Sequence, residues 1–220
     1  MLNRDQARFI LAAAAFIGIA HAITWSVTFS DGVRLGWKFA SIGLLMCYAV
    51  IHARNLDGWL LVLILLFSAA SDLLLQIAGQ TAGGLSFVVA DVIAITLYAR
   101  NRRENINLLT VSVALFFVLL CAALAYALPH DREQAIGIGF FVLPLAAMVA
   151  AAWMSRFPRP IVAIGAAMIL LSDMIIFAKL GLFEGMPWIE EVIWLVYFAG
   201  EWLVTLGVVR SLKGAPRTQY

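Results

Sequence analysis

Residues Leu65–Leu75, with the sequence LLFSAASDLLL, and residues Met168–Ile176, with the sequence MILLSDMII, both place Ser-Asp deep inside a long apolar stretch. Each stretch is long enough to cross a bilayer, which takes about 20 apolar residues. A carboxylate at the bilayer centre costs at least about 2.5–3.5 kcal/mol, so we expect Asp72 and Asp173 to have a function. They are 101 residues apart in matching contexts, which indicates one shared site.

The composition indicates a polytopic membrane protein. Of the 220 residues, 64% are hydrophobic and 13% are charged, and the mean hydropathy is +0.96. A soluble domain of this length is about half apolar and a quarter charged. We expect one integral membrane domain over residues 1–220, with the lipid bilayer as its surroundings. The net charge of only +2 gives no reason to expect nucleic acid as a partner.

Eight apolar stretches, bounded by charged residues or by Pro and Gly, predict an all-α bundle of eight transmembrane helices. They lie at about 8–29, 36–52, 59–77, 83–99, 106–127, 134–154, 161–179 and 189–209. Cys47 and Cys121 fall inside these stretches, and we expect them to be small buried residues rather than a disulfide.

The distribution of Lys and Arg predicts the orientation of the bundle. Eleven of the fifteen lie on the side that carries the N-terminus, which we call the basic side. The other four, on the opposite side, are Arg34, Lys38, Arg132 and Lys179. Eight crossings bring the chain back to its starting side. We therefore expect both termini in the cytoplasm and the protein in a membrane of the bacterial inner-membrane type.

The chain also shows an internal repeat. Asp72 lies 13 residues into the third span and Asp173 lies 12 into the seventh, so both are about 18–20 Å deep, counted from the basic side. The next spans carry a second acid in a similar pattern, FVVAD ending at Asp91 and YFAGE ending at Glu201. We therefore predict two four-helix halves of the same orientation, residues 1–105 and 106–220.

The surroundings of the two aspartates differ. Ser68, Asp72 and Gln76 share one helical face, whereas Asp173 has Ile169 and Phe177 at the same offsets. An apolar setting and a nearby like charge both favour the protonated form of a carboxyl group. Our hypothesis is that Asp173 is protonated and Asp72 ionised. The alternative is that the pair shares a proton for a structural reason.

Asp91 and Glu201 are expected nearer to mid-membrane, with Tyr197 on the same helical face as Glu201. They could line the same pocket, position water or bind a substrate hydroxyl. Equally, they could be neutral acids that are hydrogen-bonded to neighbouring helices. His21 lies at the depth of the aspartates, where a buried structural histidine is the more common case than a catalytic one.

Lys38 and Lys179 mark the opposite-side ends of the second and seventh spans. Long basic side chains at such positions usually extend to the headgroup region. Both would nevertheless lie at the mouth of the pocket that the aspartates line, where they could bind a phosphate.

Several kinds of catalytic and cofactor site find no support in the sequence. It contains no Gly-x-Ser-x-Gly, no Cys-His arrangement and no nucleotide-binding loop. No histidine pair has the spacing of metal ligands, so we expect no metal and no cofactor. Four intramembrane carboxylates could hold a hard cation, but no motif supports it.

The chain resembles the YhhN family of membrane lysoplasmalogenases. The resemblance rests on Phe67-Ser68-x-x-x-Asp72, on Leu171-Ser172-Asp173 and on Tyr197-x-x-x-Glu201, in that order. It implies that Asp72 and Asp173 are the paired catalytic aspartates. It also implies that Lys38 is the family's basic residue early in the second span. The family commonly has His at the position of Asp91, a Gln-like residue at that of Glu201 and Pro at that of Phe39.

The resemblance implies cleavage of the vinyl ether bond of a lysoplasmalogen, which gives a fatty aldehyde and a glycerophospho-alcohol. Such a reaction needs one carboxylic acid to protonate carbon and one carboxylate to stabilise the cation and activate water, a division of labour known from glycosidases. Asp173 is the expected acid and Asp72 the expected carboxylate. Ser68, Asp91, Tyr197, Glu201, Lys38 and Lys179 are the expected substrate-binding residues.

Two other classes of protein stay open from the sequence. A proton-coupled transporter of small amphiphiles would also have repeated halves and intramembrane acids. A structural or assembly protein would lose its fold, with no separable activity, when the aspartates are replaced.

Overall fold

The computed structural model describes residues 4–24, 29–186 and 188–214. These residues form eight α-helices, and with a π-helical turn that extends the seventh, all eight are long and apolar enough to cross a membrane, which confirms the predicted all-α membrane bundle. The helices are α1 (Arg4–Ile23), α2 (Asp31–His52), α3 (Leu56–Ile77), α4 (Gln80–Arg100), α5 (Leu108–Ala127), α6 (Arg132–Met154), α7 (Ile164–Ala178) and α8 (Ile189–Gly214). A π-helical turn, η2 (Arg159–Ala163), leads directly into α7.

The observed helices overlap all eight predicted spans, and the largest difference concerns the first. That span was expected to reach residue 29, whereas α1 ends at Ile23. The Thr24 hydroxyl donates to the carbonyl oxygens of Ala20 (3.1 Å) and His21 (2.9 Å) at this end. Residues 25–28 lie outside the described residues. Apolar composition continues past Ile23, so it could not locate the end of the helix.

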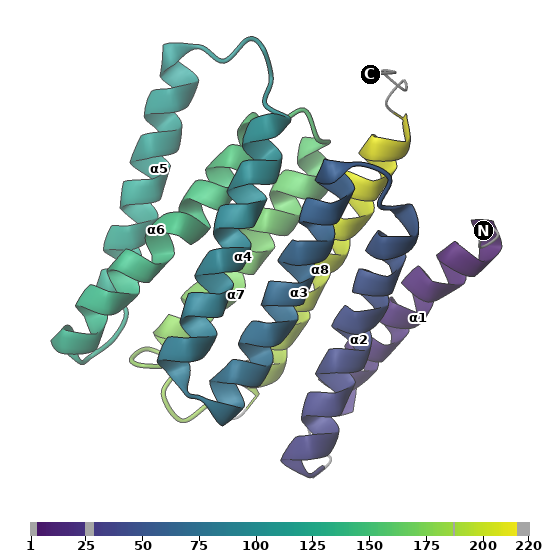
Figure 1. Cartoon of the computed structure of the whole chain (residues 1–220). Helices are drawn as coiled ribbons and strands as arrows, with labels where there is room; N and C mark the ends of the chain where they lie inside the picture. Colours follow the sequence, from purple (N-terminus) through teal and green to yellow (C-terminus); the bar gives the residue numbers. More distant parts are fainter. Residues whose placement is uncertain (1–3, 25–28, 187, 215–220) are drawn as a thin grey trace.

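Consecutive helices pack as antiparallel pairs, α1 with α2, α3 with α4, α5 with α6 and α7 with α8 (Figure 1). Helix α8 also contacts α1, α2 and α3, and α4 contacts α6. The beginning of α1 and the end of α8 lie at the same end of the bundle (Figure 1). That end is the basic side.

Polar side chains begin several of these helices. Asn55 Oδ1 accepts a hydrogen bond from the Gly58 backbone N–H at the start of α3 (2.9 Å). Asn107 Oδ1 does the same for the Thr110 N–H at the start of α5 (2.9 Å). Such caps satisfy backbone donors that the helix leaves free.

Two glycines bring α7 and α8 into direct backbone contact. A Cβ atom on Gly200 would lie 2.7 Å from the Gly165 carbonyl oxygen, and one on Gly165 would lie 2.8 Å from that of Gly200. Small residues of this kind let membrane helices approach closely. Because Gly200 precedes Glu201, this contact fixes the position of the buried acid on α8.

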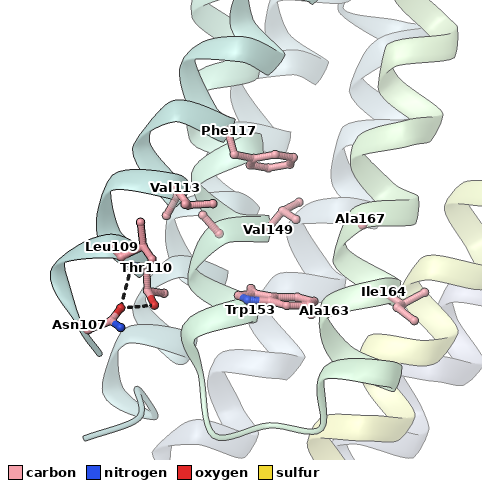
Figure 2. Close-up of a pocket in the computed structure, with 12 residues that line it drawn as sticks. Asn107, Leu109, Thr110, Val113, Phe117, Val149, Trp153, Ala163, Ile164 and Ala167 are labelled. Carbon is pink, nitrogen blue, oxygen red and sulfur yellow. Dashed lines mark hydrogen bonds between the residues drawn. The ribbon is translucent and has the colours of Figure 1, made fainter. Parts of the chain in front are cut away.

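Helix α5 lies away from the centre of the bundle, at its edge (Figure 1). It packs against α6 and only touches α7, which leaves an apolar groove between α5 and α7 (Figure 2). Cys121 of α5 is buried, as expected, and is a free thiol. Cys47 of α2 is exposed, so the expectation that it is buried was wrong: it lies on the outer face of its helix, which the apolar sequence alone does not reveal.

Candidate active site

Helices α3, α4, α7 and α8 each contribute one acid to a single cluster. Asp91, Asp173 and Glu201 are 3%, 8% and 1% exposed, and Asp72 is half-buried. Asp72 interacts electrostatically with Asp173 and with Glu201. Asp91 interacts with the same two residues, Asp173 and Glu201. The four acids that the repeat singles out therefore lie together, and two come from each predicted half.

A direct hydrogen bond joins the two predicted halves inside this cluster. Ser68 Oγ of α3 donates to Glu201 Oε1 of α8 at 3.0 Å, and both side chains are buried. Four other buried polar atoms in this region have no partner among the described residues: Asp91 Oδ2, Tyr197 Oη, Glu201 Oε2 and Thr205 Oγ1. Buried polar atoms are nearly always hydrogen-bonded in folded proteins. Each of these four atoms can therefore form a hydrogen bond with a water molecule or with a polar group of a substrate.

A small cavity lies beside the buried acids. Its volume is about 10 Å³, and its polar lining comes from Ser68, Asp91, Tyr98 and Glu201. A cavity needs a volume of at least about 10–15 Å³, together with two to four polar partners, to hold a water molecule. The cavity is therefore suited to a single water molecule between α3, α4 and α8.

The polar face of α3 runs from this buried region towards the opposite side. Ser68 is 1% exposed, Asp72 is half-buried and Gln76 is exposed. The sequence predicts that Asp173, unlike Asp72, has apolar neighbours on its helical face. Ile169, four residues before Asp173, is indeed 5% exposed and packs in the hydrophobic core. Asp72 is thus on the accessible side of the pair and Asp173 on the buried side.

Lys38 lies near the aspartates, as expected. Its Nζ is 5.1 Å from the centre of the Trp194 ring, and its charge interacts with the carboxylate of Asp72. The His21 ring packs edge-on against Trp194, 5.2 Å between centroids, and lies within electrostatic range of Lys38. An aromatic face holds a cation by electrostatic attraction. Trp194 therefore holds the ammonium group of Lys38. Because α2 begins at Asp31, Lys38 lies seven residues inside the helix, so the expectation that it marks the end of the span was wrong: the helix extends beyond the apolar stretch that predicted it.

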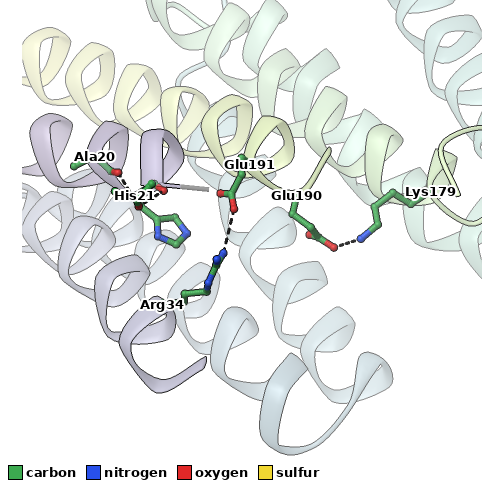
Figure 3. Close-up of polar contacts among 7 residues, drawn as sticks. Ala20, His21, Arg34, Lys179, Glu190 and Glu191 are labelled. Atoms are coloured by element: carbon green, nitrogen blue, oxygen red, sulfur yellow. Dashed lines mark hydrogen bonds and ion pairs between the residues drawn. The ribbon is translucent and has the colours of Figure 1, made fainter. Parts of the chain in front are cut away.

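Two ion pairs lie at the end of the bundle opposite the basic side (Figure 3). Arg34 Nη1 donates to Glu191 Oε1 at 3.1 Å, which links α2 to α8. Lys179, at the end of α7, forms an ion pair with Glu190 of α8. Partial burial lowers the pKa of the Lys179 ammonium group. Because Lys179 already has a carboxylate partner, Lys38 is the stronger candidate for binding a phosphate.

Sequence reasoning did not find Trp194. It lies three residues before Tyr197 and seven before Glu201, so the three share one face of α8. Its indole Nε1 donates to the Gly18 carbonyl oxygen at 3.0 Å, and its ring contacts Tyr197 at 5.9 Å between centroids. This periodicity was available from the sequence, but an aromatic residue in a membrane helix is too common to stand out.

No three His, Cys, Asp or Glu side chains among the described residues are grouped so that they could hold a metal ion. The four acids interact electrostatically with one another, and Glu201 also interacts with Ser68 and Tyr197. Carboxyl groups in such surroundings are candidates for acid–base roles. The catalytic and substrate-binding roles of the individual residues stay predictions.

Comparison with known proteins gives one match. The model of the YhhN family matches residues 33–208, from the beginning of α2 to near the end of α8. Searches of curated proteins and of solved structures find no match. The matched range includes all four acids together with Ser68, and it covers well over half of the chain; the protein therefore belongs to the YhhN family.

Proposed function

We propose that the protein is a membrane hydrolase of the lysoplasmalogenase type. It cleaves the vinyl ether bond of a lysoplasmalogen-like lysophospholipid and releases a fatty aldehyde and a glycerophospho-alcohol. Family membership supports a hydrolase only as a broad class. The observation that carries the finer proposal is the electrostatic interaction of Asp72 with Asp173, one half-buried and one buried, inside a bundle of apolar helices.

The proposed first step is proton transfer to carbon. Asp173, in its carboxylic acid form, donates a proton to the vinyl carbon that is not bonded to oxygen. The adjacent carbon and the ether oxygen then share the positive charge of an oxocarbenium ion. The carboxylate of Asp72 stabilises this cation by its negative charge. Positioned acid–base groups contribute about 10²–10⁴-fold to such a step.

Water completes the proposed reaction. Asp72 takes a proton from a water molecule, whose oxygen bonds to the cationic carbon and forms a hemiacetal. The carbon–oxygen bond to glycerol then breaks. Asp72 returns its proton to the leaving oxygen, and the Asp173 carboxylate takes the proton of the hemiacetal hydroxyl. One water is consumed, an aldehyde and an alcohol form, and both aspartates regain their starting states.

The remaining predicted residues have binding roles in this proposal. Lys38, held by Trp194, binds the phosphate of the lysolipid at the opposite side. The unpartnered oxygens of Asp91 and Glu201 and the hydroxyl of Tyr197 bind a glycerol hydroxyl or the water in the small cavity. We place the protein in a bacterial inner membrane with both termini in the cytoplasm, from the bias of Lys and Arg towards the basic side.

The test is release of fatty aldehyde by the purified full-length protein in detergent. One substrate is a lysoplasmenyl lipid, and its control is the same lipid with a saturated ether bond. We expect aldehyde from the vinyl ether only. Asp173→Asn and Asp72→Asn should each lower kcat by at least about 10²-fold, because each removes one acid–base group.

The matched control is Glu133→Gln, which changes an exposed acid in the first turn of α6 and should leave aldehyde release unchanged. Circular dichroism and gel filtration check that each variant is folded. A folded, monodisperse wild-type protein that releases no aldehyde from either lipid would refute the proposal. Proton flux into sealed vesicles upon addition of an amphiphile would then favour a transporter.

A further inference from the structure

The groove between α5 and α7 is a well-formed apolar site that the proposed reaction does not use. Its volume is about 530 Å³, within the range of about 300–1,000 Å³ that is usual for ligand pockets. Helix α6 forms its floor, and its wall on α5 runs from Asn107 to Phe117 (Figure 2). That is about 15 Å of helix, or half of the roughly 30 Å hydrocarbon core. The groove thus runs through one leaflet, on the basic side.

The groove results from a difference between the two halves of the chain. Helix α1 packs against α8, which closes that part of the bundle, whereas α5 packs against α6 and only touches α7. Most side chains that line the groove are apolar, and its polar residues, Asn107 and Thr110, lie at its basic-side end. In a membrane, the space between α5 and α7 faces lipid chains.

Two arginines lie at the same end of the groove. The guanidinium group of Arg159 is 4.7 Å from the centre of the Trp153 ring, which lines the groove, and its Nε donates to the Trp153 carbonyl oxygen at 3.0 Å. Arg103 Nε donates to the Ser155 carbonyl oxygen at 2.8 Å. Both guanidinium groups are therefore held at the C-terminal end of α6.

The charge of these two arginines is not balanced locally. Burial lowers the pKa of the Arg103 guanidinium, and the nearby positive charge of Arg159 lowers it further. In the described part of the chain, no carboxylate lies within ion-pair distance of either group, and their terminal N–H groups have no hydrogen-bond acceptor. Guanidinium groups bind phosphate through two parallel hydrogen bonds. This end of the groove is therefore suited to a phosphate.

We propose that this groove binds a glycerophospholipid from the basic-side leaflet, with one acyl chain between α5 and α7 and the phosphate at Arg103 and Arg159. The site shares no residue with the carboxylate cluster, so the inference does not depend on the proposed reaction. The apolar wall matches the chain in length, and the arginine pair matches the headgroup in charge. A water-soluble ligand would not bind here, because the groove is lined by apolar side chains and faces the lipid.

The experiment is native mass spectrometry of the full-length protein in detergent, titrated with dioleoylphosphatidylglycerol. The comparison lipid is dioleoylglycerol, which has the same chains without the phosphate. We expect one phosphatidylglycerol per protein at saturation and an affinity for dioleoylglycerol at least tenfold lower.

Two pairs of variants locate the site. Ala167→Phe adds a large side chain to an exposed position in the groove wall and should lower the affinity at least tenfold, whereas Ala123→Phe, on an exposed face of α5 away from the groove, should not change it. Arg103→Ala should weaken binding about fivefold, the effect of about one lost charge contact at a membrane surface. Arg102 precedes Arg103 and is exposed, and Arg102→Ala should weaken lipid binding by less than half as much.

Four results would overturn the inference. The first is equal affinity for the two lipids, which would mean unspecific contact with chains. The second is equal binding by Ala167→Phe and Ala123→Phe. The third is displacement of the lipid by inorganic phosphate alone, which would assign the site to free phosphate. The fourth is a stable dimer that excludes the lipid, which would assign the groove to a second copy of the chain. Both alanine positions are exposed, so these variants should fold.

Discussion

Asp72 and Asp173 each follow a serine, yet the two serines do different things. Ser71 Oγ donates to the Gly83 carbonyl oxygen at 2.9 Å and so joins α3 to α4. Ser172 Oγ donates to the Ile169 carbonyl oxygen of its own helix at 2.7 Å. The Ser71 hydroxyl is thus committed to α4, whereas Ser172 also interacts with the carboxyl group of Asp173. The Asp72 carboxyl group interacts electrostatically with Asp173 and with Lys38.

Removal of the hydroxyl of Ser68 should destabilise the fold. Ser68→Ala leaves Glu201 without its hydrogen bond to α3, and such bonds between membrane helices are worth about 0.6 kcal/mol on average and up to about 1.7. We expect a decrease of about 1 kcal/mol in the free energy of unfolding, measured by titration of detergent micelles with SDS. The control is Thr96→Ala, because Thr96 is exposed and bonds only to Val92 of its own helix. Equal losses for the two variants would contradict this prediction.

Replacement of Lys38 should affect substrate binding more than the chemical step. Lys38→Ala removes the ammonium group over Trp194, so we expect KM for the lysolipid to rise about tenfold, the value of about 1.4 kcal/mol of lost binding, with little change in kcat. Lys38→Arg should restore much of the affinity. Lys179→Ala should raise KM less, because Lys179 is paired with Glu190. An unchanged KM for Lys38→Ala would remove Lys38 from the substrate site.

At the level of single residues, the sequence could predict the part of the candidate site that consists of residues rarely found in membrane helices. A carboxylate in an apolar stretch is conspicuous, so the sequence pointed to Asp72, Asp91, Asp173 and Glu201, and the structure brings them together. The hydrogen bond from Ser68 to Glu201 was not predictable, because it joins residues 133 positions apart and depends on how α3 meets α8. Trp194 was missed because tryptophan is ordinary in such helices.

At the scale of helices, the contact of α7 with α8 sets the position of Glu201. Gly165 and Gly200 lie against each other, and Gly207 packs against the π-helical turn before α7, where its Cβ would lie 2.5 Å from Val162 Cγ2. The close contact of these two segments therefore depends on three glycines, which have no side chain. The helices themselves were predicted from apolar stretches, but this close packing depends on which glycines face each other.

Gly200→Ala should destabilise the protein and disturb the active site together. The added methyl group would lie 2.7 Å from the Gly165 carbonyl oxygen and 2.8 Å from Ile169 Cγ1, so α7 and α8 must separate. Overpacking of this kind costs about 1–3 kcal/mol, and we expect that decrease in the free energy of unfolding. Aldehyde release should also fall, because Glu201 moves with the helix.

The control for this change is Gly137→Ala in α6, where a Cβ would have no neighbour within 4 Å. Alanine favours a helix over glycine by about 0.5–1 kcal/mol, so this variant should be neutral or slightly stabilised. If both alanine variants had the same stability as the wild type, the close contact of α7 with α8 would be refuted.

At the scale of the whole molecule, the site lies where the two predicted halves meet. Helix α3 of residues 1–105 contacts α8 of residues 106–220, and the corresponding contacts of α4 with α6 and of α8 with α2 are both present. The halves are not equivalent elsewhere, because α1 packs against α8 and α5 has no such partner. The sequence repeat predicted the shared site but not this departure of α5, since both helices are simply apolar.

The orientation of the bundle can be tested with single cysteines. In a Cys47→Ser, Cys121→Ser background, Glu104→Cys lies between α4 and α5, and Glu184→Cys lies between α7 and α8. Three helices separate the two positions, so they must lie on opposite sides of the membrane. Because the basic side should face the cytoplasm, a membrane-impermeant maleimide added to intact bacterial cells should label Glu184→Cys and not Glu104→Cys. Both should react after the cells are permeabilised. The reverse pattern would invert the proposed orientation, and equal labelling of the two in intact cells would mean that the three helices between them do not all cross the membrane.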